Sequence, residues 1–178
     1  MTEPTSLDPD WHRYSPHPFP SYRYLPGQTP HPRRHPLGHS HGRSEPTPRL
    51  FPPDQWQTSD DYRYGIDLYN FAYWWESHEI FEAFWYAAGR DSEQGNFFQA
   101  LIQLAAANLK CAMCNKAAAQ RLTRAGITRL ERVASPYMGV DVSLLLQGLQ
   151  GYLSATHPHL PLIRLQDEEN VSGGGTQP

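Results

Sequence analysis

The chain has 178 residues, a formal net charge of −3 and 19% charged residues, which fits one domain around one core and gives no global reason to expect nucleic acid or an anionic membrane as a partner. No stretch approaches the roughly 18 apolar residues of a membrane-spanning helix, and the N-terminus carries acids and prolines where a signal peptide has a basic and then an apolar region. The two cysteines, Cys111 and Cys114, lie in a helix-like stretch, which argues against the disulfide framework of a secreted protein. We therefore expect a cytoplasmic protein that contacts no membrane.

Residues 1–57 are predicted to be a disordered tail. Thirteen of the 17 prolines and six of the nine histidines lie before residue 54, and the aliphatic residues there follow neither the period of a strand nor that of a helix. Such a segment buries too little apolar surface to offset the entropy lost on ordering. A His-rich tract can hold a transition metal, but we interpret this one as a flexible polar linker because an unstructured chain pre-organises no coordination geometry. The histidines concerned are His31, His35, His39 and His41.

Residues 58–157 are predicted to form an all-α domain, because apolar residues recur there at helical spacing. Five helices are expected, at about 58–70, 73–87, 97–113, 115–134 and 141–157. The first helix is expected to open at Thr58 or Ser59 and to end at Asn70, and the other expected N-caps are Asp91, Asn115 and Asp141. Gly89 is expected to stop the second helix. Short connections make successive helices antiparallel, so the predicted architecture is an up-down bundle of αα-hairpins. Residues 158–178 are predicted to be a mostly flexible tail in which Leu160, Leu162 and Ile163 tuck against the bundle.

The second predicted helix carries the side chains best suited to chemistry. It is aromatic on nearly all sides, which predicts burial, and ionisable groups in a buried helix must be paired, hydrogen-bonded or shifted in pKa. The third helix carries a narrow polar strip edged by alanines, which we expect to face these groups. The predicted polar cluster spans both helices and consists of His78, Glu79, Glu82, Gln99, Gln103 and Lys110.

The same stretch resembles the family called domain of unknown function 309. The resemblance lies in Tyr69-Asn70, in the run from Trp75 to Glu79, in Glu82 and Trp85, and in Gln99 to Gln103 with Ala105-Ala106. It covers about residues 60–152. It implies an all-helical fold with the histidine, both glutamates and both glutamines of the cluster at signature positions, and it implies no activity. Three residues stand where the family usually has glycine: Ala100, Cys114 and Ala118.

Three interpretations of the polar cluster stay open. In the first it is a buried network, in which the glutamines donate to Glu79 and Glu82, the lysine helps to neutralise them and His78 bonds Glu82. In the second, His78 and Glu82 at i, i+4 hold one metal ion. The third ligand would then be Glu79, His157 or His159. In the third interpretation it is a metal-free acid/base pocket, where the tryptophans hold one carboxylate near a neutral pKa.

Cys111 and Cys114 form a lone C-x-x-C at a helix end. Redox motifs of this spacing lie at a helix N-terminus, where the dipole lowers the thiol pKa, and this pair lies at the opposite end. We interpret the two cysteines as small core residues.

The fourth predicted helix carries arginines on one side, opposite its apolar residues. A solvated outer face is the interpretation we prefer, and the alternative is a contact for an anionic ligand, nucleic acid or an acidic partner protein. No aromatic residues alternate with the arginines, so a stacking platform for a single strand is not expected. The residues are Arg121, Arg124, Arg129 and Arg132.

Taken together, the sequence predicts a small binding or interaction domain that needs no cofactor. The alternative is a metal-dependent enzyme of hydrolytic type, with a divalent metal held by His78 and Glu82 and with Glu79 as the general base.

Overall fold

In a computed structural model of the protein, residues 6–8, 10–45 and 47–166 are described. That part of the chain contains five α-helices, one 3-10 helix and isolated β-bridges in place of strands. The helices are η1 (Pro53–Thr58), α1 (Asp60–Asn70), α2 (Trp74–Ala88), α3 (Glu93–Ala112), α4 (Lys116–Leu130) and α5 (Val142–Leu153). The predicted all-α fold is therefore confirmed, and none of these helices is long and apolar enough to cross a membrane.

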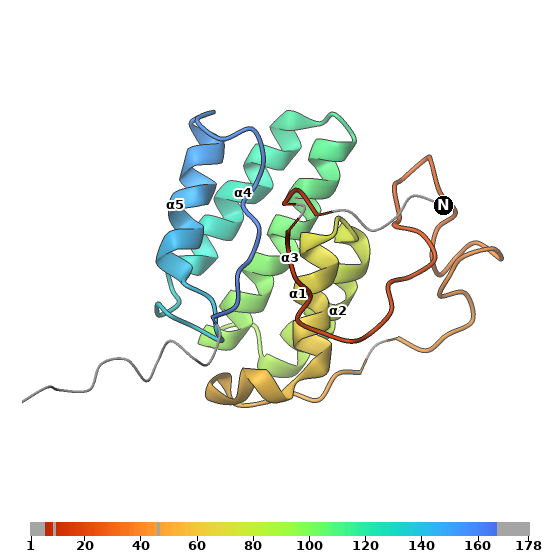
Figure 1. Cartoon of the computed structure of the whole chain (residues 1–178), viewed down its shortest axis with the longest axis horizontal. Coiled ribbons are helices and arrows are strands. Elements are labelled where there is room, and N and C mark those ends of the chain that lie inside the picture. The colour runs from red at the N-terminus through yellow and green to blue at the C-terminus, as the bar shows by residue number, and fades with distance from the viewer. Residues whose placement is uncertain (1–5, 9, 46, 167–178) are drawn as a thin grey trace, which may run out of the picture.

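The helices form an up-down bundle in which α3 is central. α3 packs against α2 on one side and α4 on the other, while α1 covers α2 and α5 covers α4 (Figure 1). The core between α1, α2 and α3 is aromatic: the fully buried Phe84 and Phe98 stack with ring centroids 4.9 Å apart, and Tyr62 meets Phe98 edge-on. Such rings bury large areas and lock the relative positions of the helices that carry them.

Five predicted helix boundaries are confirmed. Ser59, one of the two residues expected to open α1, accepts the Tyr62 amide, and α1 ends at Asn70. The side chains of Asn115 and Asp141 accept hydrogen bonds from backbone amides three residues on, at the starts of α4 and α5. Gly89 follows α2 with a φ of 84°, a conformation that glycine adopts without steric cost.

Other boundaries differ from the prediction. Ser92, one residue beyond the predicted cap Asp91, caps α3, because its hydroxyl reaches the N–H of Gly95 three residues on. Thr58, the other residue expected to open α1, does not cap that helix. The Thr58 hydroxyl instead donates to the carbonyl of Gln55 inside η1. α4 ends at Leu130, four residues before the predicted end.

Residues 10–45, called the N-terminal segment below, contain turns and bends without regular secondary structure, as the composition predicts. Beyond its first residues the segment nevertheless lies along α1 and α2, on the opposite side of the bundle from α5 (Figure 1). At its start, Trp11 lines a hollow together with Leu144 and Gly148 of α5. Trp11 and Ser15 are buried, and the ring of Phe19 stacks on that of Tyr73 at 4.9 Å. Contacts with the helices hold this segment in place, since its own apolar residues follow no helical or strand period. Residues 1–5, 9 and 46 of the predicted tail lie outside the described residues.

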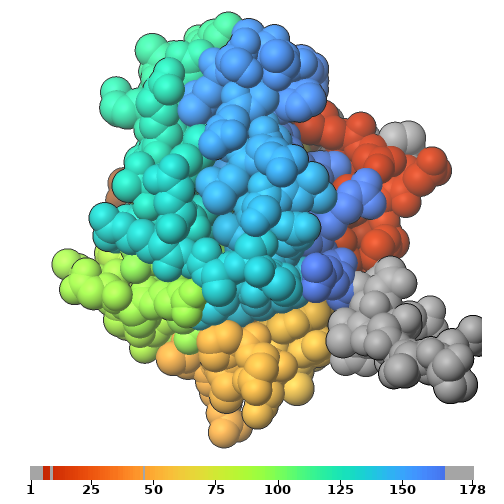
Figure 2. All heavy atoms as spheres, turned by 90° about the vertical axis from the view of Figure 1, so that its left-hand side faces the viewer, coloured from red at the N-terminus to blue at the C-terminus, as the bar shows by residue number. Residues whose placement is uncertain are grey.

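The residues that follow α5 also pack on the bundle. Leu160 and Ile163 are buried as predicted, and Leu165 forms a β-bridge with Val140, so residues 158–166 are not a free tail. The Leu165 amide also donates to the Tyr14 hydroxyl. Figure 2 shows the resulting join, with C-terminal residues in blue running beside N-terminal residues in red. Residues 167–178, which were predicted to be flexible, lie outside the described part of the chain.

Candidate functional site

Three of the predicted cluster residues come together on α2. His78, Glu79 and Glu82 are half-buried, and each offers one ligand atom such that the three atoms lie within 4.8 Å of one another. The spacing i, i+1, i+4 brings the side chains to one side of the helix. The Nδ1 atom of His78 is buried without a hydrogen-bond partner and lies 3.7 Å from a carboxylate oxygen of Glu79.

The glutamines of α3 do not complete this group. Within the described residues, Gln99, Gln103 and Lys110 make no side-chain hydrogen bond or ion pair with Glu79 or Glu82, and Oε1 of Gln103 is buried without a partner. The predicted network is corrected in one respect above all: the partner of Glu79 is Arg33 of the N-terminal segment, whose Nε donates to Glu79 at 3.0 Å. A guanidinium forms a charge-assisted bond, which is stronger than a bond from a neutral amide.

Glu79 is held in its ionised form. Burial raises the pKa of its carboxyl, but the neighbouring His78 and Arg33 outweigh burial and bring the pKa below its ordinary value of 4.5. The predicted acid/base pocket requires the reverse, a carboxylate with a pKa near neutrality. Glu79 therefore suits the role of an ion-pair partner or metal ligand better than that of a general base.

Two acids that sequence reasoning missed bind the N-terminal segment. The first is Asp67 of α1, which is fully buried and accepts hydrogen bonds from the backbone amides of Tyr14 and Ser15, both at 2.9 Å. Nε of Arg13 lies 3.5 Å from the same carboxylate. Burial raises the pKa of Asp67, and the two amides and Arg13 oppose that effect only in part. The sequence did offer a signal for Asp67, because this acid lies inside an apolar run that includes Ile66.

The second missed acid is Glu76 of α2, whose side chain is only 5% exposed. Its Oε1 atom accepts a hydrogen bond from the backbone amide of Tyr24 and lies 2.9 Å from Nε2 of His39. Its Oε2 atom is buried and has no hydrogen-bond partner. Nothing in the sequence distinguishes Glu76 from the acids beside it, because its partners lie 52 and 37 residues away along the chain.

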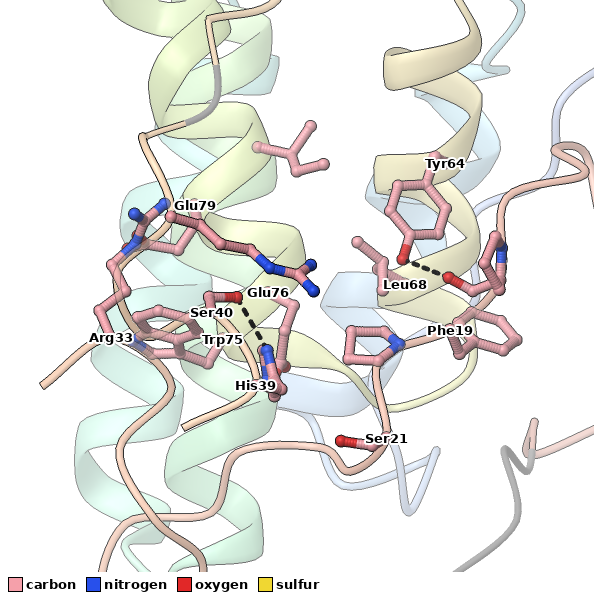
Figure 3. A pocket seen from close by; sticks show the side chains of 14 residues that line it. Phe19, Ser21, Arg33, His39, Ser40, Tyr64, Leu68, Trp75, Glu76 and Glu79 are labelled. Carbon is pink, nitrogen blue, oxygen red and sulfur yellow. Dashed lines mark hydrogen bonds and ion pairs between the residues drawn. The ribbon is translucent and has the colours of Figure 1, made fainter. Parts of the chain in front are cut away.

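A cavity of about 490 Å³ lies between the N-terminal segment and the helices. Figure 3 shows Trp75, Glu76 and Glu79 of α2 and Tyr64 and Leu68 of α1 around it, together with side chains of the N-terminal segment. Glu79 also lines a second hollow, of about 690 Å³, which Glu82 shares. Neither hollow is lined by the glutamines of α3. The three glutamates of α2 thus line hollows that the N-terminal segment helps to form, whereas His78 lines neither.

The histidines of the N-terminal segment do not gather into a metal site. His39 contacts Glu76, His31 packs edge-on against Trp75, and His35 and His41 are exposed. The described residues hold one group of three or more potential metal ligands, that of His78 with its two glutamates, and it contains neither His157 nor His159.

The four predicted arginines do not form one uniform face. Arg129 is half-buried and donates to the side chain of Asn96 at 3.0 Å. Arg121 and Arg124 are exposed on α4, while Arg132 is exposed beyond the end of that helix. The exposure of Arg121, Arg124 and Arg132 agrees with a solvated face. Binding of an anionic partner by these arginines remains a prediction.

The prediction that both cysteines are core residues is wrong. Cys111 is half-buried with its sulfur 3.1 Å from the Tyr152 hydroxyl. Cys114 is exposed, and its φ of 57° makes the turn between α3 and α4. Glycine, which the resemblance to the family implies at this position, would adopt this left-handed conformation without steric cost.

One family model matches part of the chain. Residues 62–122, from α1 into α4, match a family described as a domain of unknown function (DUF309). The match includes Asp67, Glu76 and the three clustered residues of α2. No curated protein matches the chain.

Proposed function

Over residues 62–122 the protein belongs to the domain of unknown function 309 family, and because that family supplies no activity we propose a function from the surface formed by α1 and α2. The helical domain is an interaction module that binds an extended, proline- and arginine-rich peptide on this surface. In this chain the N-terminal segment occupies the surface in cis.

Asp67 carries the proposal. A carboxylate buried to 0% exposure is costly unless donors surround it. Here the donors are the backbone amides of Tyr14 and Ser15, two consecutive residues of the bound segment. Charge-assisted hydrogen bonds of this kind are roughly twice as strong as neutral ones. Because main-chain amides are common to nearly all residues, Asp67 recognises mainly an extended backbone, and Arg13, whose Nε lies 3.5 Å from the carboxylate, adds one charged side chain.

Two tyrosine hydroxyls of the same surface donate to the carbonyls of prolines in the N-terminal segment. Tyr64 donates to the carbonyl of Pro18 at 2.9 Å, and Tyr73 donates to that of Pro20 at 3.3 Å. Burial raises the pKa of Tyr64 to about 12, so its hydroxyl keeps its proton at neutral pH. Phe19, between the two prolines, stacks on Tyr73. Aromatic surfaces that donate to proline carbonyls are a recurring way of binding extended peptides, since proline limits the entropy lost on binding.

Two acids of α2 fix the register of the peptide. Glu79 forms an ion pair with Arg33, and Oε1 of Glu76 lies at hydrogen-bond distance from Nε2 of His39, so the two acids select an arginine and a histidine six positions apart in the bound segment. Trp75, which lies between Tyr24 and His31 with edge-on contacts to both rings, fills the space beside these pairs.

A cleavable form of the full chain tests this proposal. A protease recognition sequence is inserted after Glu45, an exposed residue, the purified protein is cut, and dissociation of the labelled N-terminal fragment is followed by fluorescence anisotropy on dilution. We expect the fragments to stay together with a measurable Kd. Asp67→Ala should raise that Kd at least ~10-fold, which corresponds to about 1.4 kcal/mol.

Asp61→Ala is the matched control, because Asp61 is an exposed acid of the same helix. Its Kd should equal that of the unmodified sequence. Immediate separation of the cut fragments, or equal effects of the two substitutions, would refute peptide binding by this surface.

One observation favours a second candidate function, that of a metal-dependent enzyme. The ligand atoms of His78, Glu79 and Glu82 lie within 4.8 Å of one another, and the two glutamates line the 690 Å³ hollow. A histidine nitrogen with two carboxylate oxygens is a donor set that suits zinc, iron or manganese. In this proposal Glu79 is the third ligand, because its lowered pKa makes it a weak general base.

Metal analysis separates this candidate from peptide binding alone. Protein made without an affinity tag is titrated with Zn²⁺ by calorimetry, and His78→Ala is compared with His35→Ala, which removes an exposed histidine of the N-terminal segment. One tight site lost only in His78→Ala supports the metal enzyme, and hydrolysis of an ester probe should be lost with it. No tight site, or equal loss in both variants, excludes it.

A further inference from the structure

Arg33 is the counter-cation of an acidic pair on α2. Its Nε donates to Oε2 of Glu79 at 3.0 Å, and the two side chains are 21% and 22% exposed. Glu82 lines the same 690 Å³ hollow as Arg33 and Glu79, and it forms no hydrogen bond or ion pair within the described part of the chain. The docked segment therefore places a cation beside two carboxylates and pairs it with one of them.

The other oxygen of Glu79 faces His78. Oε1 lies 3.7 Å from Nδ1 of His78, whereas Oε2 accepts from Arg33. One ligand atom from each of His78, Glu79 and Glu82 lies within 4.8 Å of the other two. Because a zinc ion lies about 2.0–2.2 Å from nitrogen and oxygen ligands, it takes a place between such atoms that a water molecule need not fit. The hollow that the two glutamates line gives the ion its entry path.

The charges decide how such an ion affects the docked segment. Two carboxylates balance one divalent cation, so a bound ion cancels the negative charge that attracts Arg33 and adds a repulsive charge near its guanidinium. Solvent screens part of this repulsion, because the ion pair is only partly buried. The ion and Arg33 use different oxygens of Glu79, but they share its single charge. Binding of one therefore weakens binding of the other.

A closed turn, formed by residues 31–41, carries Arg33 to the acids of α2. Within it the Ser40 amide donates to the Pro32 carbonyl at 3.1 Å. A Cβ on Gly38 would lie 2.1 Å from the same carbonyl oxygen, so glycine is required for the turn to close. Because the turn is closed on itself, Arg33 is presented from a fixed backbone. Loss of its ion pair weakens the attachment of the whole turn.

We propose that a divalent transition-metal ion controls the docking of the N-terminal segment. The ion, held by His78, Glu79 and Glu82, replaces Arg33 as the counter-cation of the two glutamates and weakens the hold of α2 on the segment. This donor set suits zinc, iron or manganese. Without the ion the guanidinium serves as a built-in cation and the segment stays docked.

This coupling rests on both parts of the proposed function, the docked segment and the metal group of α2, and adds that the two oppose each other. Linkage makes the effect reciprocal: the factor by which the metal weakens docking equals the factor by which docking weakens metal binding. The two factors can be measured independently.

The dissociation assay on the cut chain, run with and without saturating Zn²⁺, measures the first factor. We expect Zn²⁺ to raise the Kd of the N-terminal fragment at least ~5-fold, the lower end of the usual coupling between two sites. Because a His-rich fragment can itself hold Zn²⁺, the same chain with His78→Ala is the control, and its Kd should not respond. An unchanged or lower Kd in the unmodified chain, or an equal rise in His78→Ala, would overturn the proposal.

Calorimetry of Zn²⁺ binding to the full chain measures the second factor. Arg33→Ala removes the competing guanidinium and should raise the Zn²⁺ affinity by about the factor that the fragment assay gives. Arg34→Ala is the matched control, because this adjacent arginine is exposed, lines the same hollow and forms no ion pair in the described part. Its effect should be at most ~2-fold, since exposed charges are screened. No gain in Arg33→Ala, or equal gains in both variants, would refute replacement of Arg33 by the ion.

The outcomes separate the coupling from the two proposals beneath it. A docked fragment and a tight Zn²⁺ site with an unchanged Kd overturn the coupling alone. Absence of a tight site removes the metal candidate and the coupling together, and leaves peptide docking in place. A fragment that separates at once without metal removes peptide docking and the coupling, while calorimetry still decides the metal site.

Discussion

Replacing Asn70 by alanine tests the join between the helices and the residues after α5. Asn70 is the last residue of α1 and is 2% exposed. Its side-chain amide donates to the carbonyl of Ile163 at 2.8 Å, and its side-chain oxygen accepts the Ile163 amide at 2.9 Å. One side chain thus satisfies both backbone groups of a residue that is itself 1% exposed.

The magnitude follows from those two bonds. In Asn70→Ala the N–H and C=O of Ile163 lose their partners in a buried place, and each unsatisfied group costs about 1–3 kcal/mol. We expect the free energy of unfolding to fall by about 2–4 kcal/mol, a large part of the ~5–15 kcal/mol of a typical domain. Urea unfolding followed by tryptophan fluorescence measures this, and hydrogen exchange at the Ile163 amide should accelerate in step.

Asn108→Ala is the control for lost volume. Asn108 is also buried, but its side chain donates, at 3.3 Å, to the carbonyl of Leu104 in its own helix, which keeps its helical partner after the substitution. Its other contact is with the Tyr69 hydroxyl, which keeps its own hydrogen bond to the carbonyl of Pro161. The expected loss is about 1 kcal/mol. Equal losses for the two variants, or unchanged exchange at Ile163 in Asn70→Ala, would show that Asn70 does not pin the C-terminal residues.

Cys114→Gly should raise the free energy of unfolding by up to about 1 kcal/mol, because glycine adopts the φ of 57° without the cost that a Cβ imposes; a lower melting temperature would contradict this. Phe98→Ala should lower it by about 3–5 kcal/mol, since Phe98 is fully buried and stacked on Phe84, and a loss near zero in urea unfolding would contradict that packing. Because the pKa of Glu79 lies below 4.5 in the folded chain, its stabilising effect is present above that pH and disappears as the pH falls through the lower folded-state pKa. Glu79→Gln should therefore reduce the acid dependence of the urea midpoint, and an identical dependence in both proteins would argue against the ion pair with Arg33.

Local chemistry explains why the helices could be predicted. Asn115, Asp141 and Gly89 act within three or four residues of themselves, so their effect on a helix end is visible in the sequence. At the starts of α1 and α3 two neighbouring residues could each cap the helix. Ser59 and Ser92 are the caps because their hydroxyls accept the backbone amide three residues on.

The candidate site was predictable only in part, for a related reason. That His78, Glu79 and Glu82 lie together follows from their spacing on one helix. That Glu79 pairs with Arg33, 46 residues earlier, and not with a glutamine of α3, depends on where the chain returns to the helix.

The sequence did not predict the 3-10 helix η1, whose residues 53–57 belong to the predicted tail. From the sequence alone, composition and periodicity determined which residues form the α-helices and that residues 10–45 form none. Only the tertiary structure decided that these residues lie on α1 and α2, with Asp67 buried beneath them. The physical reason is that Asp67 binds backbone amides, which nearly every residue has, so the contact that holds the segment leaves no pattern in the side chains that a sequence records.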